Sequence, residues 1–327
     1  GAQGRDSRAS LQQAIGLCAG TAGHIDEDTS RELFLQAMDS QDPEAEMWVA
    51  WCTFKGLCGF QQDEKSGREA AAAVIDEIRS LAFNGRTEAM FLLASASSEG
   101  LAIPQDDEQA AHWYREAADN GHAEAMVQLG RCYSGGQGVS SDDAQAVFWY
   151  RKAAESGHAI AMRLLGIHFQ LGAGVQQDLT QAVSWYQKAA DKGDTASMNR
   201  LAWSFEHGQG VAQDRAQALS WYRTSAENGN VEAMAALGWS YANGVLGEKN
   251  PGLALHWYQK AADQGHPGAM NNLGVAYDQG LGVTEDDAQA AAWYRKAAEK
   301  DDLNAMVNLA IKYDTGEGVA RDYDKAV

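Results

Sequence analysis

The sequence predicts an all-α fold, a right-handed α/α superhelical solenoid of helix-turn-helix repeats, because three sets of residues recur every 36 residues. The first set is a methionine at Met90, Met126, Met162, Met198, Met234, Met270 and Met306. The second is the dipeptide Trp-Tyr, which begins at Trp113, Trp149, Trp185, Trp221, Trp257 and Trp293. The third is a glycine at Gly100, Gly136, Gly172, Gly208, Gly244, Gly280 and Gly316. Chance does not produce three independent sets with one period.

Each repeat has the pattern of two helices joined by a glycine-rich turn. In the repeat at 123–158, one helical face is formed by Met126, Leu129, Gly130 and Tyr133. Gly136 ends this helix, because glycine readily adopts the left-handed conformation of a C-terminal cap. Asp142 is a suitable N-cap for the second helix, which carries Trp149 and Tyr150. Neither helix covers its own apolar face, so repeats must stack; we expect the longer second helices outside and the first helices on the inner wall.

The repeat boundaries divide the chain into four segments. Residues 1–7 are an N-terminal tail, 8–86 hold two divergent repeats, 87–302 hold six regular repeats, and 303–327 are an incomplete terminal repeat. We expect the extra residues of the second divergent repeat to form an extended polar loop near 61–68. We also expect the array to be one continuous body without independent domains. Since the last repeat stops before its Trp-Tyr position, we expect further residues beyond Val327 in the natural protein, or a partner that covers this end.

The charge of the chain restricts its partners. Asp and Glu number 45 against 26 Lys and Arg, which gives a formal net charge of −19. This balance argues against binding nucleic acid or an anionic membrane surface, since both require positive charge on the protein. It favours a basic protein, or one with a basic patch, which the acidic field would attract. No apolar stretch approaches the roughly 20 residues of a membrane-spanning helix.

The four cysteines do not form a recognisable site in the sequence. Cys18, Cys52, Cys58 and Cys132 are too few and too scattered for a disulfide-dense scaffold, and their spacing is not that of a zinc site. We interpret them as small buried apolar residues, with a Cys52–Cys58 disulfide as the alternative. Their disulfide status stays open at this point.

Sequence motifs for catalysis are not evident. The G-x-G elements lack a following Lys-Ser/Thr, and neither H-E-x-x-H nor G-x-S-x-G occurs. The recurring aspartates are interpreted as helix N-caps, because they stand at equivalent helix starts: Asp106, Asp142, Asp178, Asp214, Asp286 and Asp322. His122, His158 and His266 share one position at the junction between repeats and are interpreted as helix-terminal residues. His168 and His207 are isolated, which makes a metal site the weaker interpretation. We therefore expect no enzyme activity, no cofactor and no metal.

The pattern E-A-M-x-x-L-G-x-x-Y-x-x-G-x-G-V-x-x-D, followed by W-Y-x-x-A-A-x-x-G, resembles the Sel1-like repeat family, a relative of tetratricopeptide repeats. The resemblance is specific over 87–319 and thin over 8–86, and the repeat with Asn250-Pro251 departs from the usual loop. The resemblance implies an adaptor or scaffold that binds protein. It does not indicate which ligand is bound. Known members include immunity partners of secreted effectors and envelope factors, so the resemblance implies a periplasmic or secreted protein. No signal peptide is present in this chain, which begins with Gly1.

The variable positions of the first helices form the candidate binding surface. One position carries an apolar run, Ile167, Trp203, Trp239, Val275 and Ile311. Glu206, Asp278 and Asp314 edge this run, and Arg163 lies on the same face. An apolar centre with a polar rim is typical of a protein interface. Burial between neighbouring helices is an equal alternative for the Ile and Val positions, whereas we expect the tryptophans to be exposed.

The leading hypothesis is a non-catalytic protein-binding solenoid, an adaptor or inhibitor. A specific form is a bacterial immunity protein that binds and neutralises a secreted toxic effector. One alternative is an envelope scaffold in polysaccharide export or protein assembly. Another is a carbohydrate- or peptidoglycan-binding module that uses Trp203 and Trp239 as stacking platforms. The binding surface is either the concave face or an end of the array.

Overall fold

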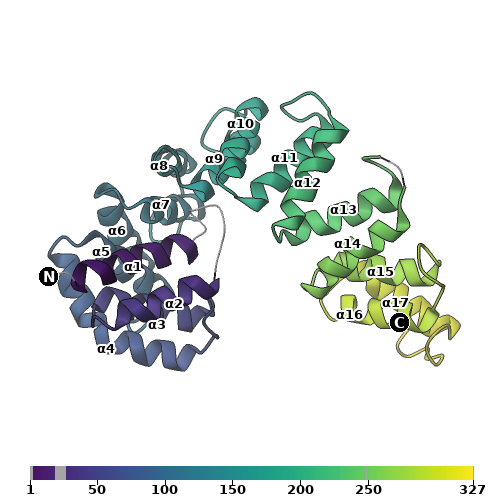
Figure 1. The fold of residues 1–327 in the computed structure, drawn as a ribbon, viewed down its shortest axis with the longest axis horizontal. Coiled ribbons are helices and arrows are strands. Elements are labelled where there is room, and N and C mark those ends of the chain that lie inside the picture. The colour runs from purple at the N-terminus through teal and green to yellow at the C-terminus, as the bar shows by residue number, and fades with distance from the viewer. Residues whose placement is uncertain (1–2, 19–26, 248, 327) are drawn as a thin grey trace. The chain divides into compact units, whose positions relative to one another are not determined.

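The structure is a computed structural model that describes residues 3–18, 27–247 and 249–326, with side chains from Arg8 onward (Figure 1). These residues form seventeen α-helices and no β-strand, which confirms the predicted all-α class of helix repeats. No helix among them has the length and apolar character needed to cross a bilayer.

The helices follow one another in pairs. Four precede the regular repeats: α1 (Gln3–Cys18), α2 (Glu27–Met38), α3 (Pro43–Lys55) and α4 (Glu64–Phe83). The first helices of the regular repeats are α5 (Thr87–Glu99), α7 (Ala123–Gly135), α9 (Ala159–Leu171), α11 (Thr195–His207), α13 (Val231–Asn243), α15 (Pro267–Asp278) and α17 (Leu303–Thr315). The second helices are α6 (Asp107–Asp119), α8 (Asp143–Glu155), α10 (Leu179–Asp191), α12 (Arg215–Glu227), α14 (Pro251–Asp263) and α16 (Asp287–Ala298).

The chain forms two compact units, Gly1–Asp194 and Thr195–Val327, rather than the one body expected. Within each unit, every helix packs against the helices that precede and follow it in the chain. Solenoid repeats contact only their neighbours, so no single core joins all of them and compactness is a local property.

Two expectations about length are wrong. The second helices of the regular repeats are not longer than the first, since α5 and α6 both have 13 residues. The extra residues of the second divergent repeat do not form a longer loop; they extend α4 to 20 residues. An insertion of about two turns keeps the apolar face of a helix in register, which explains why the helix absorbs it. The tail expected over 1–7 overlaps α1, which begins at Gln3, and residues 1 and 2 lie outside the described part.

Capping groups fix both ends of the helices. The glycine that follows each regular first helix has a left-handed φ of 63–81°, as predicted: Gly100, Gly136, Gly172, Gly208, Gly244, Gly280 and Gly316. The predicted aspartate N-caps are confirmed, because each of these carboxylates accepts a backbone N–H in the first turn of the second helix: Asp106, Asp142, Asp178, Asp214 and Asp286. Asp322 accepts the N–H groups of Asp324 and Lys325 in the same manner.

The histidines at the repeat junctions are also N-caps. The Nδ1 atoms of His122, His158 and His266 accept backbone N–H groups at the starts of α7, α9 and α15. In two repeats the other ring nitrogen faces a glutamate of the preceding first helix, at 3.4 Å for His122–Glu88 and 2.8 Å for His158–Glu124. Although burial raises the pKa of Glu124, the contact with His158 holds it below its usual value. These histidines therefore have a structural role.

The core of each regular repeat is a close contact between the two helices. The tyrosine of the Trp-Tyr pair is buried in all six complete repeats, and in four of them its ring lies on a first-helix glycine: Gly130, Gly166, Gly238 and Gly274. A Cβ added to Gly274 would lie 2.4 Å from Cε1 of Tyr294, and one added to Gly166 would lie 2.6 Å from Cε1 of Tyr186. Such distances are far inside van der Waals contact, so these glycines set the spacing of the helix pair.

A Gly→Ala substitution tests this packing, because the change in the free energy of unfolding should have opposite signs at packed and at open positions. We expect Gly274→Ala to destabilise the second unit by about 1–3 kcal/mol, because the new methyl group overlaps Tyr294. Gly252→Ala is the matched control, since its added Cβ meets only Asn250 Oδ1 at 3.5 Å. The control should be neutral or stabilising by up to about 1 kcal/mol, because alanine is the better helix former. Urea unfolding of both variants measures the difference; equal effects would refute the packing argument.

Candidate functional site

The exposed apolar side chains of the second unit's first helices form the candidate site. The exposed fractions are 41% for Trp203, 49% for Trp239 and 52% for Ile311, whereas Val275 is half-buried. A tryptophan normally buries most of its surface, so two half-exposed ones at the same position of adjacent repeats need an explanation. Exposure of the tryptophans agrees with the expectation from the sequence.

Trp203 is held in place by its own helix. Its indole stacks on the imidazole of His207, with ring centroids 4.5 Å apart and 25° between the planes. His207 Nδ1 lies 3.0 Å from the carbonyl oxygen of Trp203, which fixes the imidazole. The indole is therefore ordered before any partner arrives, which lowers the entropy cost of binding through it.

Trp239 lines a pocket of about 410 Å³ between α13, α14 and α15. The apolar part of its wall includes Trp239, Leu255, Tyr258, Val275 and Leu281. The polar part of the wall consists of three amide side chains and one lysine: Asn243, Asn272, Gln279 and Lys249. The structure thus brings Trp239 and Val275 to one pocket, which the sequence did not reveal. The departure of this repeat at Asn250-Pro251 was the available signal, because Pro251 also lines the pocket.

Two of the three predicted rim carboxylates are engaged within the fold. Glu206 accepts a hydrogen bond of 2.8 Å from the hydroxyl of Tyr222, and Asp278 one of 3.4 Å from Tyr294. Burial first, and the neighbouring carboxylate second, raises the pKa of each tyrosine. Asp314 is exposed on α17, where it lines a second pocket together with Ile311. Of the three rim carboxylates, two are therefore used by contacts within the fold, which leaves fewer for a partner than the sequence suggested.

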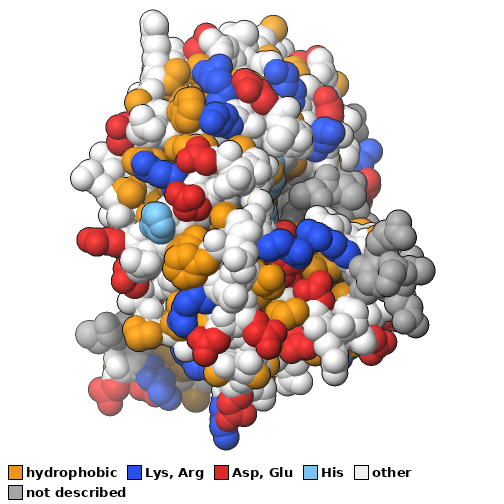
Figure 2. Space-filling view, turned by 90° about the vertical axis from the view of Figure 1, so that its left-hand side faces the viewer, with side chains coloured by type: hydrophobic (Ala, Val, Ile, Leu, Met, Phe, Trp, Pro, Cys, Tyr) orange, Lys and Arg blue, Asp and Glu red, His pale blue; other side chains and the backbone are white. Residues whose placement is uncertain are grey.

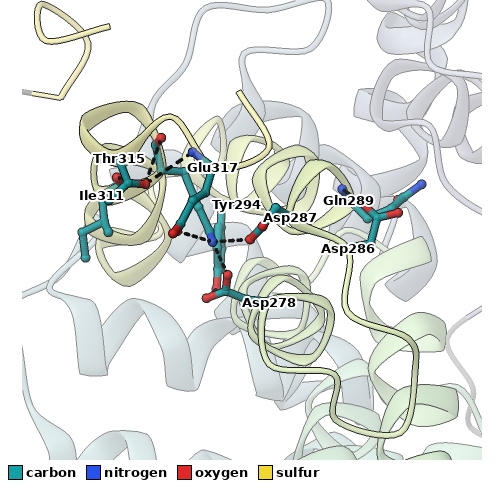
Figure 3. Close-up of polar contacts among 9 residues, drawn as sticks. Asp278, Asp286, Asp287, Gln289, Tyr294, Ile311, Thr315 and Glu317 are labelled. Atoms are coloured by element: carbon teal, nitrogen blue, oxygen red, sulfur yellow. Dashed lines mark hydrogen bonds and ion pairs between the residues drawn. The ribbon is translucent and has the colours of Figure 1, made fainter. Parts of the chain in front are cut away.

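Asp278 also belongs to an ion-pair cluster around Lys312 on α17. Figure 3 shows Asp278, Asp287 and Glu317 converging from α15, α16 and the turn after α17. The Nζ atom of Lys312, a residue only 4% exposed, contacts Asp278 and lies 2.6 Å from Asp287 and 3.2 Å from Glu317. Burial alone would lower the pKa of Lys312, but the three carboxylates raise it. The lysine therefore stays charged across the neutral range.

The Lys312 cluster was missed in the sequence although a signal was available. None of the equivalent residues of the other regular repeats is a lysine, and most are small: Ala96, Cys132, His168, Ser204, Ser240 and Ala276. A lysine at a position that is otherwise buried is the departure. Where most of the other repeats bury a small side chain, Lys312 forms ion pairs with three carboxylates. Two of these, Asp278 and Asp287, belong to the preceding repeat, so the cluster ties α17 to that repeat.

The two predicted site residues of the first unit, Arg163 and Ile167, lie on α9. Arg163 is committed to an ion pair, with its Nε atom 3.1 Å from Oδ2 of Asp194. Ile167 is half-buried. Both residues belong to the first unit, so the candidate site consists of residues of the second unit alone.

Removal of the Lys312 charge should destabilise the end of the second unit. We expect Lys312→Met to cost about 1–3 kcal/mol, less than a fully buried pair would, because the carboxylates are partly exposed to water. The cost should shrink in high salt, which screens the repulsion among the carboxylates left behind. Lys300→Met, at an exposed position of the preceding repeat, is the control and should change stability by less than about 0.5 kcal/mol. Chemical denaturation at low and high salt measures both; a salt-independent loss would rule out the electrostatic account.

Several solved structures are similar to this chain. A Sel1 repeat protein from Oxalobacter formigenes shares 29% identity; 90% of this chain and 84% of that chain are covered, with a TM-score of 0.68. A protective antigen of uropathogenic Escherichia coli shares 28% identity over 98% of this chain and 82% of its own, with a TM-score of 0.47. An immunity protein from Pseudomonas aeruginosa shares 21% identity over 67% and 84% of the two chains, with a TM-score of 0.45. No curated protein sequence matches the chain at a significant level.

The repeats themselves identify the family. The Sel1 repeat matches seven consecutive segments: 87–122, 123–158, 159–194, 195–230, 231–266, 267–302 and 303–327. These segments span well over half of the chain, and their first helices begin at equivalent positions in the structure. The chain therefore belongs to the Sel1 repeat family.

Proposed function

We propose that the second unit of this Sel1 repeat solenoid binds a protein that carries a basic patch, through Trp203, Trp239, Val275 and Ile311. Sel1 repeat solenoids are in general non-catalytic protein-interaction scaffolds. The observation that supports this surface is Trp239, half-exposed at the wall of a 410 Å³ pocket. Binding energy in protein interfaces concentrates in aromatic anchors and the pockets beside them.

The pocket sets the shape of the partner's contribution. Its apolar wall would accept one bulky apolar side chain, while Asn243, Asn272 and Gln279 offer donors and acceptors to the backbone on either side of it. Trp203, ordered by His207, would cover the adjacent part of the partner. The partner is therefore expected to present an apolar residue to the pocket, with its basic patch placed away from Lys249, which also lines the pocket.

The net negative charge of the chain also favours a basic partner. The chain has a net charge of −19, and Asp314 lies exposed beside Ile311. On the face shown in Figure 2, Lys and Arg side chains are interspersed with Asp and Glu, so that face is not uniformly acidic. The net charge would attract a basic protein from a distance, and apolar contact would hold it.

The specific form that we favour is a bacterial immunity protein, periplasmic or secreted, that binds and neutralises a toxic effector. Its support is the combination of acidic charge with a pre-ordered aromatic surface, since an inhibitor of a basic toxin needs fast capture and slow release. An envelope scaffold for polysaccharide export or protein assembly is the alternative within the same class, and would use the same surface.

Carbohydrate is the second candidate ligand. The specific observation in its favour is that Trp239 and Tyr258 share a pocket with three amide side chains, an arrangement that suits stacking and hydroxyl recognition. Salt separates the candidates. Between about 0.05 M and 0.5 M salt, affinity for a basic protein should fall by at least about tenfold, whereas affinity for a neutral glycan should hardly change. Calorimetric titration at the two salt concentrations decides between them.

The tryptophan at the pocket should be an interface residue and not a core residue. We expect Trp239→Ala to weaken partner binding by about 2 kcal/mol, or about thirtyfold, with little change in melting temperature. Trp257→Ala is the core comparison, since Trp257 is 7% exposed and its removal should cost about 3–5 kcal/mol of stability. The parent and variant chains are used to capture proteins from cells of the natural host. Each captured protein is then purified and titrated against the parent and variant chains to measure its affinity.

A surface control completes this experiment. Phe148→Ala removes another exposed aromatic side chain, on α8 in the first unit, and should leave capture unchanged. A protein captured equally by the parent and Trp239→Ala chains does not use the proposed surface. If Trp239→Ala lowers the melting temperature as much as Trp257→Ala, the residue belongs to the core and the proposal fails.

A further inference from the structure

Three of the four cysteines meet at one point in the first unit. Their sulfur atoms all lie within 4.8 Å of one another, although Cys18 ends α1, Cys52 lies on α3, and Cys58 lies in the turn between α3 and α4. Cys18 and Cys58 form a disulfide with Cα atoms 5.2 Å apart, so the pairing differs from the Cys52–Cys58 alternative considered for the sequence. Cys52 is a free, fully buried thiol, and its Sγ atom lies 3.3 Å from Sγ of Cys58.

Cys52 and Cys58 are joined by a short backbone turn. The carbonyl oxygen of Cys52 accepts the N–H groups of Gly56 and Leu57, and these bonds form the turn that carries Cys58. Cys58 has a left-handed φ of 56° in this turn, and its Sγ atom lies 3.3 Å from Sγ of Cys52. The two sulfurs therefore belong to one local structure, whereas the third sulfur comes from a separate helix.

We propose that these three cysteines form a thiol–disulfide exchange site, in which Cys58 changes its disulfide partner from Cys18 to Cys52. The Cys52 thiol first gives its proton to solvent. Its sulfur then attacks Sγ of Cys58, an S–S bond forms between Cys52 and Cys58, and the bond between Cys58 and Cys18 breaks. The electron pair leaves with Sγ of Cys18, which takes a proton from water. One disulfide and one thiol are present before and after, so no oxidant or reductant is consumed.

The exchange changes what the crosslink holds. In the Cys18–Cys58 form, the bond ties α1 to the turn after α3, across a sequence separation of 40. In the Cys52–Cys58 form it closes only the local turn, and α1 is held by non-covalent contacts such as buried Leu11 and the hydrogen bond from Ser30 Oγ to the carbonyl oxygen of Ala14. The free thiol also moves from the fully buried Cys52 to the half-buried Cys18. The exchange thus creates a site that small thiols, disulfides and alkylating reagents can reach.

Burial sets the rate of this exchange. It raises the pKa of the Cys52 thiol to about 12, so the attacking thiolate is rare at neutral pH. The rate should therefore rise about tenfold for each pH unit between about pH 7 and 10. Cys132 is the natural control, because it is also buried and free but lies on α7, away from the three sulfurs.

Disulfide mapping tests the proposal on the oxidised full chain. Samples are incubated at about pH 7 and pH 9.5, quenched in acid, alkylated with N-ethylmaleimide and digested without reduction for mass spectrometry. We expect the Cys52–Cys58 pair and labelled Cys18 to appear together, about 300-fold faster at the higher pH. The C132S variant should behave as the parent, and C52S should keep Cys18–Cys58 at both pH values.

Two locked variants test the consequence for α1. C52S retains the Cys18–Cys58 bond, and C18S leaves Cys58 to pair with Cys52. Because each variant keeps one disulfide, we expect both to be folded, which far-UV circular dichroism checks. Backbone amides of residues 8–18 should exchange hydrogen at least about tenfold faster in C18S than in C52S. Detection of only Cys18–Cys58 in the parent after prolonged incubation at pH 9.5 overturns the proposal. A disulfide to Cys132, or equal exchange of α1 in the two variants, also overturns it.

Discussion

The close contact between a second-helix tyrosine and a small first-helix residue is the constraint on which the rest of the structure depends. Gly166 and Gly274 leave no room for a methyl group beneath Tyr186 and Tyr294. In the four repeats with a glycine at this position, the contact sets the spacing of the helix pair, and the capping residues fix where each helix begins and ends. Because these positions are satisfied within each repeat, the remaining surface positions are free to differ between repeats.

The freedom of the surface positions is limited by the same tyrosines. A buried tyrosine hydroxyl needs a hydrogen-bond partner. In two repeats this partner is a carboxylate near the end of the first helix, Glu206 for Tyr222 and Asp278 for Tyr294. Carboxylates that look like a binding rim in the sequence are therefore partly used by the fold. Lys312 extends this logic at the last helix, where an ammonium group joins three carboxylates that would otherwise repel one another.

The two units depart from the common pattern in different ways. The second unit keeps the regular helix pairs and varies its exposed residues, which produces the tryptophans and the pocket at Trp239. The beginning of the first unit departs from the repeat itself, with a longer α4 and a disulfide to α1. A solenoid tolerates both kinds of departure because each repeat needs to match only its immediate neighbours.

The sequence by itself determined the helix pairs, boundaries and caps of the regular repeats, because each depends on residues close together in the chain that recur with one period. It also singled out Trp203 and Trp239, whose position varies while the core positions do not. Only the tertiary structure decided which side chains meet: Trp239 with Leu255 and Tyr258, Lys312 with its three carboxylates, and Cys18 with Cys58. These contacts join residues from different helices and mostly occur once. A repeating pattern therefore carries no information about them, and they follow only from how neighbouring helices pack.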